Sequence, residues 1–341
     1  MDGIRQIPYG VSDFVSIRED NLYYIDKTMY LAELESQPRT LIFIRPRRFG
    51  KSLFISMMQA YYDKAMAGRF DELFGDLWVG KHPTPLRNRY QVMYFDYSRA
   101  GGTIERLEDN FNEYSCGCID SFIDRYKDEY PQRIVEKVLQ TNSSRAKLNL
   151  INNAAHELRI PLYLIIDEYD TPMMRNLYND DMLKELRNML RGFYQTVKIE
   201  GAHIKFAFIT GVTKFSQLSI FSELNNLVQI SMEDDYSGIC GITQHELDTV
   251  LRPCVEEYAQ CLNISTSEAY ALLKRNYDGY HFSAKSQDIY APFSLLRALN
   301  LKSTSHYWFE SGTMTALIEH LKHYPEYNPL DFDGVELSLD A

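Results

Sequence analysis

The residues Gly50, Lys51 and Ser52 stand between the apolar run Leu41–Ile44 and a helix-like apolar pattern. A loop that binds phosphate needs backbone N–H groups aimed at the phosphate oxygens, a lysine for the outer phosphates and a hydroxyl for Mg²⁺. The helix that follows adds the positive end of its dipole. These residue types predict a phosphate-binding loop, although Arg45 occupies the place where the usual pattern has its first glycine.

The residues expected to bind phosphate extend from this loop into the first turn of the following helix. Lys51 is expected to reach the β- and γ-phosphates, and the Ser52 hydroxyl to ligate Mg²⁺. The arginines would form a local collar of positive charge around a triphosphate. A basic surface turn is the alternative interpretation. The predicted nucleotide ligands are Arg47, Arg48, Phe49, Gly50, Lys51, Ser52 and Leu53, and the collar also includes Arg45.

A second candidate site follows the apolar run Leu162–Ile166, which leads directly into Asp167 and Glu168. In a Walker B element the first acid holds Mg²⁺, and in one large class of ATPases the glutamate after it polarises the attacking water. Both acids would lie at the carboxyl end of a buried strand, where ligands gather in open α/β sheets. The alternative is a strand that ends in a solvated acidic turn, and Asp170 follows closely.

A third candidate lies at the end of the next apolar run, Ile204–Val212. In the same ATPase class this strand carries a polar residue that contacts the γ-phosphate or places the water. Thr210 and Thr213 are the two candidates, since a hydroxyl can donate and accept hydrogen bonds. An ordinary exit from a strand into a turn is the alternative.

Strands and helices must position these candidate residues. Apolar runs alternate with helical patterns, which predicts an α/β fold with a parallel sheet covered by helices on both faces. The phosphate-binding loop predicted above makes this an expected fold of the P-loop NTPase type. After about Ser237 the pattern becomes mainly helical. We therefore predict two domains, residues 1–235 with an N-terminal strap and residues 236–341. The expected strands are Leu41–Ile44, Gln91–Ser98, the run that opens Pro161–Asp170, Ile204–Val212 and Asn226–Met232.

Composition limits the classes of function. The formal net charge is −11, so general binding to nucleic acid is disfavoured and any contact with polyphosphate should be local. No apolar run approaches the ~20 residues that a membrane-spanning helix needs, and the N-terminus lacks the pattern of a secretory signal. Five cysteines, including Cys116 and Cys118, fit reduced structural thiols in a cytoplasmic protein.

Eight segments together resemble a bacterial family of AAA-ATPase-like proteins, and the resemblance covers nearly the whole chain. In that family an arginine-rich loop replaces the glycine-rich start, so Arg45 is the family's own variant. The quoted segments are IPYGVSDF, YYIDKT, RPRRFGKSL, LIIDEYDTP, FITGVTKFS, FSELNNL, NYDGYHFS and YAPFSLLRAL.

The resemblance implies a P-loop ATPase core with a variant Walker A, RPRRFGKS, and a Walker B, LIIDE. It also implies that a helical or winged-helix-like domain follows the core. Typical members continue into a domain resembling the PD-(D/E)XK nucleases. This chain is expected to stop before that domain, as a truncated piece, so nuclease activity is not carried over.

Two aromatic segments and one arginine pair have open interpretations. Tyr9 or Phe14 could stack on adenine, or could belong to a strap that packs on the sheet. Tyr277 and Tyr280 occupy a segment where related ATPases place a nucleotide sensor, or they are core residues beside a turn at Gly279. Arg187 and Arg191 lie one helical turn apart, and a solvated helix face explains them as well as an arginine finger does.

The main functional hypothesis is Mg²⁺-dependent binding and hydrolysis of ATP, with Glu168, Lys51, Thr210 and Thr213 as the catalytic candidates and Ser52 and Asp167 at the metal. The preference for ATP rests on the resemblance. One alternative is a nucleotide-dependent switch with slow turnover, whose partner is a second copy or another protein. Others are the ATPase module of a nucleic-acid-processing protein, acting through the absent domain, and a scaffold with an inactive loop.

Overall fold

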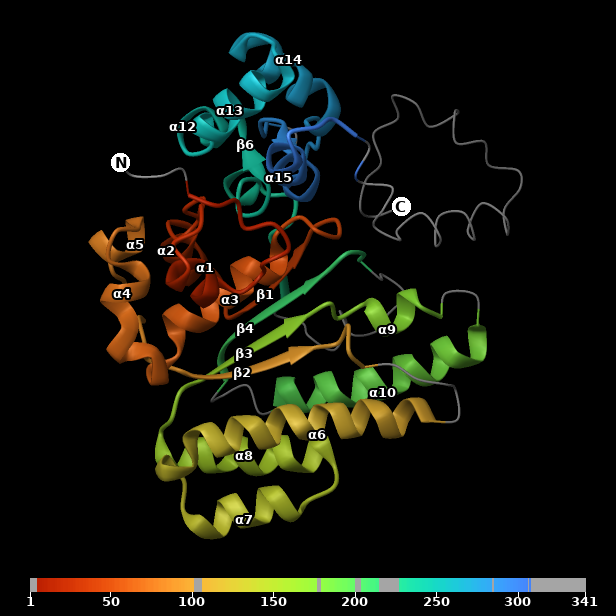
Figure 1. Cartoon of the computed structure of the whole chain (residues 1–341). Coiled ribbons are helices and arrows are strands. Elements are labelled where there is room, and N and C mark those ends of the chain that lie inside the picture. Colours follow the sequence, from red (N-terminus) through yellow and green to blue (C-terminus); the bar gives the residue numbers. More distant parts are fainter. Residues whose placement is uncertain are drawn as a thin grey trace. The chain divides into compact units, whose positions relative to one another are not determined.

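A computed structural model describes residues 5–100, 106–176, 179–199, 204–214, 227–283, 285–305 and 307. It divides the chain into two compact units (Figure 1). One unit contains residues 26–45 and 52–232, and we call it the sheet unit. The other contains residues 1–25, 46–51 and 233–341, and we call it the helical unit. Each is described separately.

The sheet unit is built on five parallel strands in the order β2-β3-β4-β1-β5. Strand β4 therefore separates the strand before the loop, β1, from the strand with the two acids, β3. All residues of β1 and β3 are buried, as expected for a parallel sheet covered on both faces. The strand bounds are β1 Thr40–Ile44, β2 Gln91–Asp96, β3 Leu162–Asp167, β4 Ile204–Gly211 and β5 Leu227–Gln229.

Helices cover both faces of this sheet. Figure 1 shows α6, α8 and α10 along one face, with α7 outside them. On the opposite face the ring of Phe54 in α3 packs against Phe208 of β4. The helices of this unit are α2 Tyr30–Glu35, α3 Lys51–Tyr62, α4 Phe70–Phe74, α5 Trp78–Lys81, α6 Leu107–Tyr126, α7 Gln132–Gln140, α8 Ser144–Leu158, α9 Thr171–Met174 and α10 Asp180–Ile199, with 3-10 turns at Lys64–Arg69 and Lys127–Glu129.

The predicted α/β fold with a parallel sheet and helices on both faces is confirmed. Each of the five predicted strands corresponds to an observed one, with ends that differ by a few residues. No helix among the described residues is both long enough and apolar enough to cross a membrane.

The helical unit has a core of its own, which includes Leu247, Tyr258, Leu273 and Leu295. Capping boxes begin α12 at Thr243 and α14 at Ser265; a side-chain cap of this kind contributes about 1 kcal/mol to a helix. A two-stranded antiparallel ribbon, which the sequence did not predict, joins β6 to β7. The elements are α1 Phe14–Glu19, a 3-10 turn Asp234–Tyr236, β6 Ile242–Thr243, α12 Gln244–Thr249, α13 Arg252–Leu262, α14 Thr266–Tyr277, β7 Ile289–Tyr290 and α15 Pro292–Leu301.

The N-terminal strap belongs to this helical unit, because Ile7 and Tyr23 pack against its core. The change between units at Met232 and Glu233 lies close to the predicted boundary. The division into domains 1–235 and 236–341 remains a prediction, and the expected helix and tail after residue 307 lie outside the described residues.

Candidate functional site

One residue from each predicted motif, Ser52 and Asp167, lies in the sheet unit, and their side chains meet there. The Ser52 hydroxyl donates a hydrogen bond of 2.8 Å to the Oδ2 atom of Asp167. Ser52 lies in the first turn of α3, and Asp167 is the last residue of β3. The Asp167 side chain is 2% exposed, so its contacts are made where water screens charges little. Residues 115 positions apart in sequence are thus brought into one polar cluster.

The same carboxylate joins β3 to β4. Its Oδ1 atom accepts a hydrogen bond from the Thr210 hydroxyl and one from the Glu168 N–H. Of the two predicted threonines, Thr210 therefore contacts Asp167 through its side chain. Thr213 takes part through its backbone, since its carbonyl accepts a hydrogen bond of 2.6 Å from the Tyr169 hydroxyl.

Glu168 has a strained backbone. Its φ is +52°, in the left-handed region that costs a non-glycine residue on the order of 1–2 kcal/mol. Its carboxylate accepts a hydrogen bond of 3.1 Å from the Thr171 hydroxyl, and its carbonyl accepts one from the Thr171 N–H. Strain of this kind persists where neighbours over-determine it and often marks a functional turn.

Asp170 connects this turn to the end of β4. Its Oδ2 atom accepts hydrogen bonds from the N–H groups of Val212, at 2.9 Å, and Thr213, at 2.6 Å. The other oxygen, Oδ1, is buried with no hydrogen-bond partner in the described structure. Burial raises the pKa of this carboxyl to about 6, although the two N–H groups oppose the shift. Asp170 was noted in the sequence only as a third acid, and this structural role was missed.

The raised pKa of Asp170 predicts a pH-dependent stability. Because the folded state holds this proton more tightly than an ordinary carboxyl, with a pKa of 3.8, the group stabilises the fold most at low pH. That contribution should fall by roughly 3 kcal/mol in all as pH rises from about 3.8 to about 6, at about 1.4 kcal/mol per pKa unit, and roughly 2 kcal/mol of this fall lies above pH 4.5. Urea unfolding of Asp170→Asn and of the unaltered chain measures this contribution. As pH rises from 4.5 to 7, the free energy of unfolding of the variant should increase relative to that of the unaltered chain.

The matched control is Asp128→Asn, which removes an exposed carboxylate from the same unit. Its stability difference from the unaltered chain should stay within about 0.5 kcal/mol over that pH range. A difference for Asp170→Asn that is equally flat would contradict the assignment.

The loop itself lies in the helical unit, from Pro46 to Lys51. Arg48 and Gly50 have left-handed backbones, with φ of +61° and +98°. Lys51 is 3% exposed, and its ammonium group donates a hydrogen bond of 3.2 Å to the Pro46 carbonyl. The helix α3 begins at Lys51, so the N–H groups of Ser52 and Leu53 belong to its first turn, which leaves N–H groups without helical partners.

Arg45 does not belong to the predicted collar. It is 1% exposed, and its guanidinium donates hydrogen bonds to the carbonyls of Ile44 and Ser231. The guanidinium carbon also lies 4.3 Å from the centre of the Phe43 ring. The Arg45 guanidinium therefore lies inside the sheet unit, where it donates hydrogen bonds to backbone carbonyls. Only Arg47, Arg48 and Lys51 remain as cationic candidates in the loop.

A second acid, Asp96, lies beside Asp167 and was missed in the sequence. It ends β2 and is paired in register with Asp167 on β3. Arg99 lies 3.2 Å from its carboxylate. Burial, with added contributions from Asp167 and Asp96, raises the pKa of the Tyr94 hydroxyl, as expected where negative charge accumulates. The sequence could have identified Asp96, because it is an acid near the end of a predicted strand, in the segment FDYS.

The aromatic segments have structural roles. The Phe14 side chain is fully buried and its ring meets Tyr24 edge-on. Tyr9 packs on Phe293, with ring centres 5.5 Å apart. Tyr277 is buried in the core of the helical unit. These contacts support the core interpretation of Tyr277, and they give the strap a structural role on the core of the helical unit, whereas the sequence prediction had it packing on the sheet. Arg187 and Arg191 lie on α10, and no described contact assigns either one the role of an arginine finger.

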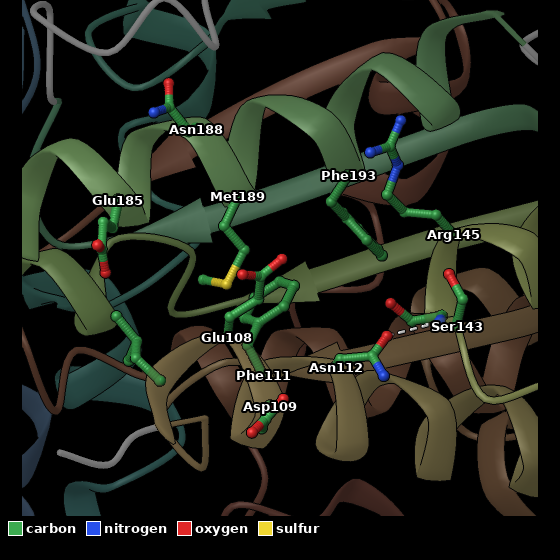
Figure 2. Close-up of a pocket in the computed structure, with 12 residues that line it drawn as sticks. Glu108, Asp109, Phe111, Asn112, Ser143, Arg145, Glu185, Asn188, Met189 and Phe193 are labelled. Atoms are coloured by element: carbon green, nitrogen blue, oxygen red, sulfur yellow. Dashed lines mark hydrogen bonds between the residues drawn. The ribbon is translucent and has the colours of Figure 1, made fainter. Parts of the chain in front are cut away.

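A separate pocket of about 640 Å³ lies between α6, α8 and α10. Figure 2 shows Asn112 and Ser143 at one side of it and Met189 with Glu185 at another. None of the predicted site residues lines it.

The oxygen donors fit Mg²⁺. Within the described residues, no group of three or more His, Cys, Asp and Glu side chains could hold a metal ion by itself. Mg²⁺ commonly takes one or two protein oxygens and completes its shell with water and phosphate oxygens. The Ser52 hydroxyl and the Asp167 carboxylate, joined by a hydrogen bond of 2.8 Å, offer two hard oxygen atoms of the kind that Mg²⁺ prefers.

Comparison with known proteins places these features in a family. A family model described as a predicted AAA-ATPase matches residues 8–221. An "Uncharacterized protein in vnfD 5'region" of Azotobacter chroococcum mcd 1 is 31% identical over 342 residues, which covers 95% of this chain and 58% of the relative. The chain thus spans little more than half the length of that relative. No solved structure matches the chain.

Proposed function

Because the chain belongs to the predicted AAA-ATPase family, we propose that it binds ATP with Mg²⁺ and hydrolyses it. The observation that carries the proposal is the hydrogen bond between Ser52 of the loop motif and Asp167 of the acidic motif. A hydroxyl and a carboxylate at this distance are the two protein ligands that a nucleotide-bound Mg²⁺ requires. ATP is favoured over other nucleotides by the family description alone.

Each residue has a defined part in the proposal. The Lys51 ammonium and the N–H groups from Arg47 to Leu53 bind the β- and γ-phosphates. Ser52 and Asp167 hold Mg²⁺, which when bound neutralises charge on the phosphate oxygens. Glu168 accepts a proton from the attacking water or orients it. Thr210 orients Asp167 and is the better placed of the two threonines, because its hydroxyl already reaches that carboxylate.

Positioning and charge stabilisation dominate this chemistry, since phosphoryl transfer needs little covalent help from the protein. The free thiols of all five cysteines support a reducing, cytoplasmic setting. A second copy of the chain or another protein is the proposed partner that sets the turnover rate. Contact with nucleic acid is proposed only through the further domain that typical members carry.

The test is calorimetric titration of ATP and ADP with Mg²⁺, with phosphate release measured in the same samples. Lys51→Ala should weaken binding by about 10–100-fold, because hydrogen bonds to a charged group contribute about 1.5–3 kcal/mol. Glu168→Gln should bind normally and release phosphate about 100-fold more slowly.

The outcomes separate the alternatives. Binding without turnover by the unaltered chain would favour the nucleotide-dependent switch. Turnover that rises with DNA and falls with salt would favour the nucleic-acid-processing module. Absence of binding, with Lys51→Ala indistinguishable from the unaltered chain, would contradict the proposal.

A further inference from the structure

The ring of Phe49, at the centre of the arginine-rich loop, is held by residues more than 190 positions away in the sequence. Phe49 is 1% exposed. Its ring meets Tyr280 edge-on with centres 4.8 Å apart, and Phe282 at 5.2 Å. Its carbonyl accepts a hydrogen bond of 3.1 Å from the Gly241 N–H. All four residues belong to the helical unit.

We define a socket as Gly241, Tyr280 and Phe282, which contact Phe49, together with Ile289, which is hydrogen-bonded to Tyr280. Tyr280 and Ile289 exchange two backbone hydrogen bonds, of 2.8 and 3.3 Å. Strand β7, which contains Ile289, pairs with β6, which directly follows Gly241. The socket is therefore made of short backbone segments that hydrogen bonds join to one another.

Gly241 is the tightest point of the socket. Its φ is +92°, and a Cβ atom there would lie 2.8 Å from the Phe49 ring and 2.1 Å from Ile289. A side chain at this position would thus be strained by its backbone and would displace Phe49. Only glycine at position 241 leaves room for the Phe49 ring and also lets its own N–H donate to the Phe49 carbonyl.

The position of Phe49 determines the backbone on either side of it. Arg48 and Gly50, its two neighbours, both have positive φ, and the Arg48 guanidinium lies 4.1 Å from the centre of the Phe293 ring. In this loop Arg45 replaces the first glycine of the usual pattern. A loop that is already held in one conformation loses less entropy when it binds a ligand.

We infer that Tyr280, Phe282 and Gly241 are positioning residues for the phosphate-binding loop and act on the nucleotide through Phe49. This inference rests on the proposed nucleotide binding and deepens it. In this interpretation the NYDGYHFS segment positions the loop that we propose binds the phosphates. By linkage, a nucleotide that favours this loop conformation stabilises the socket by the same free energy.

The experiment compares Phe282→Ala and Gly241→Ala with the unaltered chain in Mg²⁺-ATP titrations, in the KM and kcat of phosphate release, and in hydrogen exchange of amides 277–283. Phe282→Ala removes one of the two edge-on aromatic contacts and should raise the dissociation constant and KM several-fold. Gly241→Ala displaces Phe49 from both rings and should raise them about tenfold, and kcat should change less than threefold in either variant. Mg²⁺-ATP should slow exchange of those amides in the unaltered chain but not in the variants.

Two controls separate positioning from general damage. Gly10→Ala places a methyl group on another left-handed glycine, with φ +78° and no atom within 4 Å of the new Cβ, and should leave KM unchanged. Tyr280→Ala should raise KM as Phe282→Ala does, and the conservative variant Tyr280→Phe, which keeps the ring that meets Phe49, should restore most of the affinity. Should Phe282→Ala fail to fold, Phe282→Leu retains most of the volume and should still raise KM.

Normal affinity in Phe282→Ala and Gly241→Ala, beside weakened binding in Lys51→Ala, would overturn this inference and leave the proposed function standing. A lower kcat at unchanged KM would also overturn it. Absence of nucleotide binding by the unaltered chain would overturn the proposed function and this inference together.

Discussion

Replacing Asp167 with asparagine is expected to lower kcat for phosphate release by about 10²–10³-fold and to leave the fold intact. The asparagine amide is the same size as the carboxylate. Its oxygen can still accept a hydrogen bond, and its NH₂ group can donate to the Ser52 or Thr210 hydroxyl, since hydroxyls also accept. What is lost is the negative charge that we propose ligates Mg²⁺, and electrostatic contributions of this kind dominate phosphoryl transfer.

Two measurements distinguish this loss of charge from misfolding. The free energy of unfolding of Asp167→Asn in urea should stay within about 1 kcal/mol of the unaltered chain. The affinity for ATP should no longer depend on whether Mg²⁺ or EDTA is present, whereas the unaltered chain should bind more tightly with Mg²⁺. If Asp167→Asn retained both its turnover and its Mg²⁺ dependence, the metal assignment to Asp167 would be wrong.

The sheet and its two motifs were predictable because they depend on local patterns. The strand run of the second motif is apolar at every position from Leu162 to Ile166, and such runs indicate a strand buried on both faces. Ser52 at the start of a helix and Asp167 at the end of a strand are both expected at the carboxyl edge of a parallel sheet. The hydrogen bond between them follows from that placement.

Other features depend on side-chain direction or on distant partners, which local patterns do not contain. Arg45 has the same residue type as Arg47, and only the tertiary structure directs its guanidinium to Ser231. The strands β6 and β7 have two residues each, too few to produce a period-2 signal. One partner of Phe49 is a glycine, Gly241, whose position follows from the path of the backbone.

Gly211 is a position where substitution by alanine, which adds one methyl group, should strongly disturb the candidate site. A Cβ atom there would lie 2.6 Å from the Asp170 Oδ1 atom and 2.6 Å from two carbons of the Tyr169 ring. Neither neighbour can move freely, because Asp170 accepts hydrogen bonds from Val212 and Thr213. The Tyr169 ring is 1% exposed and its hydroxyl is bonded to the Thr213 carbonyl.

Gly211→Ala should therefore destabilise the fold by about 1–3 kcal/mol, the usual cost of overpacking. A shift of Gly211 also moves the residues bonded to it, since its carbonyl accepts the Arg45 N–H at 3.2 Å and Thr210 precedes it. A misplacement near 1 Å can cost about 10²-fold in rate, so kcat should fall by about 10–100-fold. Urea unfolding and phosphate release on the same samples measure the two effects.

The matched control is Gly117→Ala on α6, where a new Cβ would have no atom within 4 Å. That substitution should stabilise the helix by about 0.5–1 kcal/mol, because alanine loses less backbone entropy than glycine, and it should leave turnover unchanged. The Asp170 and Tyr169 contacts are what distinguish the two glycines. If Gly211→Ala were as stable and as active as Gly117→Ala, the turn after β3 would have room to adjust, and the contacts between Asp170 and β4 would not be what positions Thr210.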